Sequence, residues 1–427
     1  MKEIFESILE YVKELEIIDT HEHLPHRETA RDQDTDILKE YLIHYFNRDL
    51  VSAGLGEEGY RQVTDTKLPL MKRWEKVEPF WEAARHTGYG RSLDIAVKAL
   101  YGIDGIHRST IEEANAAFME SLKPGHFHKV LKEKSKIKVS LLDNHLDCDP
   151  RFFRTVYRLD TFIYPKTYWD KKRIEGEAGI RICSFEDWLE ACEILLEKAL
   201  NKGAVALKSG LAYQRSLRYD RVTRQDAEEE FLEVFKTKNS PDWEGQAFSL
   251  GKKFQDYMMH FILRMANKRN LTFQFHTGLQ EGNGNYISHS DPSLLTNLFL
   301  EYPDVDFDIF HIGYPYQHVL SALAKNFPNV YIDMCWAHII SPTASVNALV
   351  EWIDSVPINK ISAFGGDYCF VDGVYGHQYL ARLNVSKALA IKVEEGVFDE
   401  ERAKEIAKML FYENPYRIFK LEGKLEP

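Results

Sequence analysis

Two histidines one residue apart, His21 and His23, follow the short apolar run Ile17-Ile18. We expect this stretch to form a buried strand, and alternate residues of a strand point to the same face. Both imidazoles would then lie together at the end of the strand, and neutral imidazole binds zinc, iron, nickel or copper. The two histidines are therefore a candidate pair of metal ligands, although an isolated His-x-His motif is equally compatible with a surface loop.

Four further residues that could complete such a site follow other apolar runs. Lys208 follows residues 204–207, His276 follows 271–275, His311 follows 305–310, and Asp367 lies just after 360–364. Taken singly, a histidine there could cap a backbone carbonyl, and the lysine could pair with an acid. Taken together, five of the six residues are common metal ligands, which favours one metal centre built from several strand ends.

The order of the apolar runs predicts the elements that position these residues. Strands are expected at about 17–23, 137–142, 155–159, 204–207, 271–275, 305–310, 330–334 and 360–364. Helical periodicity is found at about 184–200, 224–237, 246–268, 291–301, 316–326 and 344–355. Strands that alternate with helices pair in parallel, so eight such units predict an α/β protein with a closed (β/α)₈ TIM barrel. An open doubly wound sheet is the alternative, but no glycine-rich phosphate loop follows the first strand.

Residues 27–135 interrupt this alternation with a pattern that is mostly helical, in which Leu38, Leu42 and Tyr45 share one face. We predict a single domain over residues 1–427 with a large helical insertion after strand one. Most aromatic residues of the insertion would form its own core. Because long insertions in compact domains are usually functional, we also expect it to cap an active site.

Net charge, apolar runs and cysteine content indicate which binding partners and which cellular location to expect. The formal net charge of −12 disfavours nucleic acid and anionic membranes as partners, and leaves a small-molecule substrate. No run approaches the roughly 20 apolar residues of a membrane span. The amino-terminal residues fit an amphipathic helix, not a signal peptide. Five cysteines without paired spacing favour reduced thiols and a cytoplasmic location. A homo-oligomer is left open by the sequence.

Several segments together resemble the amidohydrolase superfamily. They are Asp19-Thr-His-Glu-His23, Ala206-Leu-Lys208, Phe275-His-Thr-Gly278, His311-Ile-Gly313, Phe364-Gly-Gly-Asp367 and the closing Glu413-Asn-Pro-Tyr-Arg-Ile-Phe419. The resemblance is to the amidohydrolase-related branch, which includes metal-dependent TIM-barrel hydrolases, nodulin/FluG-type hydrolase domains and relatives of uronate isomerase. It spans nearly the whole chain except the insertion, and it does not specify a substrate.

This resemblance implies roles for the strand-end residues. His21, His23 and Asp367 would bind a divalent metal, with His276 as a further ligand. Asp367 would also accept a proton from metal-bound water. His311 would either bind a second metal or act as a base and polarising group beside a single one.

The number of metals depends on Lys208 in this interpretation. In binuclear relatives a strand-four lysine is carboxylated and bridges two metals, whereas mononuclear relatives keep an unmodified lysine nearby. One or two ions per chain are therefore expected. Zn²⁺ is the first choice, and Mn²⁺, Fe²⁺ and Ni²⁺ are alternatives.

Four other residues are candidates for the substrate pocket. Arg158, Tyr213 and Arg215 follow strand ends, and arginine suits bidentate binding of a carboxylate. Trp336 follows strand seven, where it would form a pocket wall or pack against the barrel. The structural alternative for Arg215 is a solvated loop or an ion pair with Asp220.

These observations predict a metal-dependent hydrolase that activates water for attack on an amide, ester or lactone of a small polar substrate, such as one bearing a carboxylate. His311 and Asp367 would be its catalytic residues. The alternative is a non-hydrolytic enzyme with one metal, either a decarboxylase or a uronate-isomerase-like enzyme. A non-catalytic binding protein is the third hypothesis, and it would predict eroded site residues, whereas all six are intact.

Overall fold

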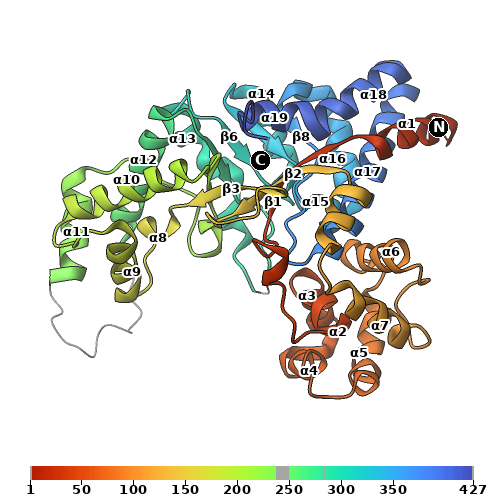
Figure 1. Ribbon diagram of the computed structural model, residues 1–427. Helices are drawn as coiled ribbons and strands as arrows, with labels where there is room; N and C mark the ends of the chain where they lie inside the picture. Colours follow the sequence, from red (N-terminus) through yellow and green to blue (C-terminus); the bar gives the residue numbers. More distant parts are fainter. Residues whose placement is uncertain (1, 237–249, 283, 426–427) are drawn as a thin grey trace.

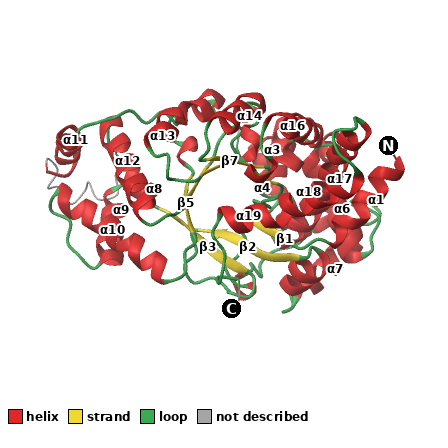
Figure 2. Cartoon of the chain, turned by 90° about the horizontal axis from the view of Figure 1, so that it is seen from above, coloured by secondary structure: helices red, strands yellow, loops and turns green. Residues whose placement is uncertain are grey.

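The protein is a barrel of eight parallel strands (Figures 1 and 2). The computed structural model describes residues 2–236, 250–282 and 284–425. The strands are β1 (Ile17–Glu22), β2 (Ile137–Asp143), β3 (Phe153–Arg158), β4 (Ala206–Ser209), β5 (Thr272–Phe275), β6 (Phe307–Ile309), β7 (Val330–Asp333) and β8 (Ile361–Ser362). They pair in sequence order, and Thr20 N donates to Phe364 O at 3.1 Å to bring the two edges together. The predicted (β/α)₈ barrel is confirmed.

All eight expected strands are present, and differences are confined to their ends. The strand expected at 360–364 stops at Ser362, because Ala363 N turns away and donates to Leu410 O at 2.9 Å. The helix expected at 246–268 begins at Lys252, and residues 246–249 lie outside the described residues.

The helices outside the insertion surround the sheet. They are α1 (Lys2–Glu14), α8 (Asp160–Ile163), α9 (Tyr168–Ala178), α10 (Phe185–Asn201), α11 (Arg224–Lys236), α12 (Lys252–Lys268), α13 (Thr296–Glu301), α14 (Gln317–Asn326), α15 (Ala337–Ile340), α16 (Pro342–Ser355), α17 (Val371–Glu394), α18 (Glu400–Lys408) and α19 (Asn414–Ile418). Helix α10 begins with a capping box in which Ser184 Oγ accepts from Asp187 N. No helix in the described residues is long and apolar enough to cross a membrane.

The insertion forms a helical lobe beside the barrel (Figure 1). Its helices are α2 (Ile37–Tyr41), α3 (Tyr45–Leu50), α4 (Gly56–Val63), α5 (Leu70–Ala84), α6 (Gly88–Tyr101) and α7 (Ile111–Ser121). Trp81 is fully buried inside the lobe, with its ring centroid 5.1 Å from that of Phe46 and 6.1 Å from that of Trp74. These aromatic residues form the core of the lobe.

A small apolar cluster fills part of the barrel. Ile18, Val139 and Val156 of the first strands pack with Ile418 and Phe419 at the end of α19. The carboxyl-terminal segment therefore packs against apolar residues of β1, β2 and β3. These apolar residues come before the polar residues at the ends of the same strands. The candidate site is built at those ends.

Candidate metal centre and adjoining cavity

Three donor atoms from β1 and the loop after β8 form a compact group. His21 Nε2 lies 3.3 Å from His23 Nε2 and 3.6 Å from Asp367 Oδ1, and His23 Nε2 lies 3.1 Å from Asp367 Oδ1. Ligands at 2.0–2.2 Å around a tetrahedral metal ion lie roughly 3.3–3.6 Å apart. The spacing of the three donors therefore fits a divalent metal.

The electrostatics keep these donors in the forms that bind metals. Burial lowers the pKa of His21 well below its ordinary value, and the nearby Lys208 charge lowers it further. Burial alone raises the pKa of Asp367, but the hydrogen bond with His23 and the neighbouring histidines bring it well below its ordinary value. A neutral imidazole and an ionised carboxylate result.

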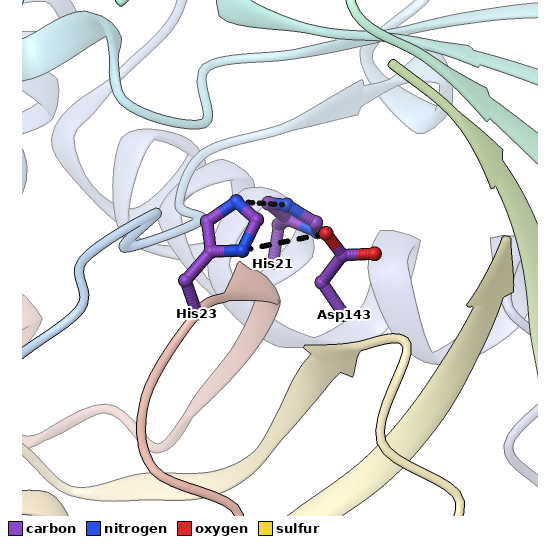
Figure 3. A group of neighbouring side chains, drawn as sticks. All are labelled: His21, His23 and Asp143. Atoms are coloured by element: carbon purple, nitrogen blue, oxygen red, sulfur yellow. Dashed lines mark hydrogen bonds and ion pairs between the residues drawn. The ribbon is translucent and has the colours of Figure 1, made fainter. Parts of the chain in front are cut away.

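Asp143 at the end of β2 orients His23. Its Oδ2 lies 3.3 Å from His23 Nδ1, so the proton of the imidazole faces the carboxylate and leaves Nε2 free for a metal (Figure 3). Among the described residues, His21, His23 and Asp143 also form one of two groups whose possible ligand atoms all lie within 4.8 Å of one another. In the sequence, Asp143 directly follows the strand expected at 137–142, and this position is what could have marked it as a site residue.

A second donor group involves His276 and His311. His311 Nε2 lies 2.9 Å from His276 Nδ1 and 3.7 Å from Asp367 Oδ2. The other nitrogens face backbone carbonyls, since His276 Nε2 is 2.9 Å from Leu279 O and His311 Nδ1 is 3.0 Å from Cys335 O. Each imidazole must place its proton on that second nitrogen to satisfy the carbonyl.

Two lone pairs therefore face each other between His276 and His311. Protonation of either ring is disfavoured, because burial lowers the pKa of His311 to about 4 and that of His276 well below its ordinary value. A bound cation is the natural partner for two such lone pairs. Cys335 lies near His311 and Asp367, but burial raises the pKa of its thiol well above the ordinary value, so it stays a protonated thiol.

Lys208 lies between the donor groups and a charged wall. Its Nζ is 2.7 Å from His21 Nε2 and stacks 4.4 Å from the centre of the Phe310 ring. Burial lowers the pKa of Lys208, and the positive charge of Arg158 lowers it further. The lowered pKa favours the neutral amine, which is the form that can react with CO₂ or approach a metal.

One candidate metal ligand, His23, lines a cavity of about 1120 Å³. Arg158, Tyr213, Lys166 and Arg173 also line this cavity. Of the described residues predicted to bind substrate, Arg158 and Tyr213 thus reach the cavity. The inner end of the cavity meets the donor group at His23.

Arg158 is held rigidly in this wall. Its Nε donates to Asp143 Oδ1 at 2.9 Å, and its Nη2 lies 2.5 Å from Asp143 Oδ2. Burial alone lowers the pKa of Arg158, but Asp143 and Asp160 raise it, so the guanidinium stays charged. A fixed guanidinium beside the donor group suits the carboxylate of a small substrate.

Arg215 and Trp336 are not among the residues that line this cavity, although the ring of Trp336 lies 5.1 Å from that of His311. Arg215 is buried, and its guanidinium pairs with Asp256 Oδ1 at 2.7 Å and donates to Gln255 Oε1 at 2.9 Å. Trp336 is 1% exposed and stacks on Tyr45 with centroids 4.3 Å apart. The prediction that they bind substrate gains no support from these positions, because packing partners already occupy both side chains.

Comparison with known proteins finds similarity over parts of this chain. A family model described as amidohydrolase matches residues 226–421. The chain is 27% identical to protein FluG of Emericella nidulans over 176 residues, which is 40% of this chain and 20% of FluG. It is 25% identical to a uronate isomerase of Shouchella clausii over 309 residues, which is 66% of this chain and 62% of that enzyme.

The predicted resemblance to the amidohydrolase superfamily is confirmed. The uronate isomerase of Thermotoga maritima shares the fold of this chain, with a TM-score of 0.79 at 15% identity over 98% of this chain and 97% of that one. The two curated relatives extend beyond the matched regions, since the chain spans one fifth of FluG and 62% of the Shouchella enzyme.

Two site residues of this amidohydrolase-like barrel come from the insertion. His44 lines the cavity with its ring 6.3 Å from that of His23, and its φ of 59° is in the left-handed region. Tyr45 donates its hydroxyl to Asp367 O at 2.6 Å. No motif in the sequence points to His44, and helical periodicity places Tyr45 only on an apolar face.

Proposed function

We propose that this protein is a metal-dependent isomerase of a small sugar acid. The observation that carries the proposal is the 309-residue match to a uronate isomerase in a chain whose candidate ligands meet a cavity with a fixed arginine. The Arg158 guanidinium would hold the carboxylate of the acid. The aldehyde end would then point toward His21, His23 and Asp367.

Interconversion of an aldose and a ketose transfers one hydrogen from C2 to C1 and one from O2 to O1, and consumes no water. A bound divalent metal would polarise the carbonyl and hydroxyl oxygens of the sugar. His44 is a candidate to carry the carbon-bound proton, because it lines the cavity and its Nδ1 is buried without a hydrogen-bond partner. Burial lowers the pKa of His44 to about 4, so its imidazole is neutral and has a lone pair to accept a proton. Asp367 would accept the hydroxyl proton.

The test is conversion of uronic acids by metal-loaded protein. Glucuronate and its stereoisomers would be incubated with zinc- or manganese-loaded protein in D₂O and followed by NMR. We expect formation of the ketose, with loss of activity after chelation and a strong reduction in Arg158→Met. If protein that retains bound metal converts none of these acids, the isomerase proposal is wrong.

Hydrolysis by a two-metal site is the second candidate, and the facing lone pairs of His276 and His311 beside Lys208 favour it. Elemental analysis of protein grown with zinc and bicarbonate separates the two. Near two ions per chain, with a carboxylated Lys208 visible by ¹³C NMR after labelling with ¹³C-bicarbonate, would support hydrolysis of an amide, ester or lactone. Near one ion per chain supports the isomerase.

A further inference from the structure

The loop between β8 and α17 carries Asp367 in a conformation that a non-glycine residue adopts rarely. The φ of Asp367 is 56°, in the left-handed region. Such a backbone persists only where surrounding contacts impose it. The contacts that impose it here therefore determine where the carboxylate lies relative to His21 and His23.

One set of contacts comes from β1. Asp367 N donates to His21 O at 2.8 Å, and the flanking amides donate to β1 side chains, Gly366 N to Asp19 Oδ1 and Tyr368 N to Glu22 Oε2, each at 2.9 Å. These bonds hold one side of the loop against the strand that carries the histidines. They leave the far side of the loop to be held by other elements.

The helical lobe holds that far side. Tyr368 Oη is 2.9 Å from Ser92 Oγ of α6, and Ser92 Oγ in turn donates to Tyr89 O at 2.7 Å. Helices α6 and α17 approach so closely that a Cβ on Gly376 would lie 1.9 Å from Ser92 O. The side chain of the residue next to Asp367 is thus fixed to the lobe.

A buried carboxylate completes the attachment. Asp372, at the start of α17, accepts from Tyr41 Oη at 2.7 Å and from Tyr101 Oη at 2.5 Å, and its Oδ1 is 2.6 Å from His126 Nε2. All three donors belong to the insertion, and Asp372 is only 1% exposed. The three partners come from α2, α6 and the segment after α7, so this one side chain joins separate parts of the lobe.

We propose that the helical insertion is the scaffold that positions the metal ligand Asp367, and that Asp372 and Tyr368 are its positioning residues. Neither side chain is placed among the donor atoms; both act through the backbone that carries Asp367. The proposal rests on the metal-dependent site described above, but it holds for either candidate reaction. It assigns the lobe a role in every metal-binding event, whether or not the lobe also covers the cavity.

The test uses Asp372→Asn and Tyr368→Phe in the full chain. We expect each variant to bind Co²⁺ at least about tenfold more weakly than the wild type, in the range seen when groups behind metal ligands are removed. In the metal-free protein, amide hydrogen exchange of the 363–372 segment should accelerate, while exchange in β4 and β5 stays unchanged. A merely structural role would not single out this segment.

Glu78→Gln is the matched control. Glu78 lies on α5 of the same lobe and accepts from Arg108 Nη2 at 2.6 Å, and neither residue belongs to α2, α6 or α17. This variant should remove an ion pair of the lobe while Co²⁺ affinity stays within about twofold of wild type. If Asp372→Asn does not fold, Tyr368→Phe alone tests the proposal. This variant removes only the hydroxyl that contacts Ser92 Oγ, so we expect it to fold.

Wild-type Co²⁺ affinity and wild-type exchange in the folded variants would overturn the proposal. An equal loss of affinity in Glu78→Gln would do the same, since it would trace the effect to a general change in the lobe and not to the contacts of Asp372 and Tyr368. These outcomes are independent of the substrate. A wild-type protein that binds Co²⁺ but converts no uronic acid would refute the isomerase proposal alone.

Discussion

Asp367 uses its two carboxylate oxygens on different partners. Oδ1 faces His21 and His23, and Oδ2 faces His311. This residue therefore belongs to both donor groups, and it is also the carboxylate proposed to accept a proton. Replacing Asp367 should therefore lower activity and metal affinity more than replacing any one histidine does. Its loss weakens both donor groups and also removes the proton acceptor.

Asp367→Asn keeps the size of the side chain and removes its charge. We expect kcat to fall by about 10²–10⁴-fold, the usual contribution of a positioned acid or base, together with weaker metal binding. Steady-state kinetics on an identified substrate and metal titration measure both effects. The control is Glu281→Gln, which changes a carboxylate of the cavity wall outside the donor groups. Undiminished turnover in Asp367→Asn would exclude the proton-transfer role.

At the scale of elements, helix α2 carries a half-buried acid whose environment opposes its charge. Glu40 accepts a hydrogen bond from Thr35 Oγ1 at 3.2 Å. Burial raises the pKa of Glu40 to about 7, against the opposing influence of Arg31 and with a further increase from Asp372. The folded protein thus binds this proton more tightly than the unfolded chain does. The stability associated with Glu40 is present below the unfolded pKa of 4.5 and is lost as the pH rises through about 7.

Glu40→Gln should remove this pH dependence. We expect the variant to be more stable than the wild type at pH 8 by roughly 1–3 kcal/mol, and the difference to shrink toward pH 5, because the wild-type carboxyl is then protonated. Urea unfolding at the two pH values measures the change. Glu58→Gln on α4, where the side chain is exposed, should show no such trend. A constant difference between Glu40→Gln and wild type at both pH values would refute the prediction.

At the scale of the whole molecule, the donor atoms come from strands far apart in the sequence. His21, Lys208, His276 and His311 lie at or just after the ends of β1, β4, β5 and β6, and Asp367 follows β8. These residues meet only when the barrel has formed, so a metal that binds them binds the folded state in preference to the unfolded chain. Such binding is linked to stability.

Chelation should therefore destabilise the protein as well as inactivate it. At free metal 100-fold above the Kd, linkage gives a stabilisation of about 2.7 kcal/mol, which corresponds to a thermal midpoint several degrees higher. Calorimetry before and after treatment with EDTA, and after return of zinc, measures the shift. Variants that lack His21 and His23 should show no response to zinc. An unchanged midpoint in wild-type protein that demonstrably gains metal would contradict this coupling.

Local sequence patterns are enough to predict the barrel and the strand ends that meet in it. Strands of parallel sheets are short apolar runs, and the alternation with helices leaves few topologies. Once the barrel was predicted, its geometry required residues after β1, β4, β5, β6 and β8 to share one mouth. That is why His21, Lys208, His276, His311 and Asp367 could be grouped without any structure.

Only the tertiary structure decided which polar residues are free to act. Local sequence cannot show that Arg215 pairs with Asp256, that Trp336 stacks on Tyr45, or that His44 reaches the cavity from the insertion, because these contacts join distant segments through packing. The left-handed backbone of Asp367 is likewise imposed by β1 and the helical lobe. Strand ends follow from local periodicity, whereas the position of a side chain in the site depends on everything packed around it.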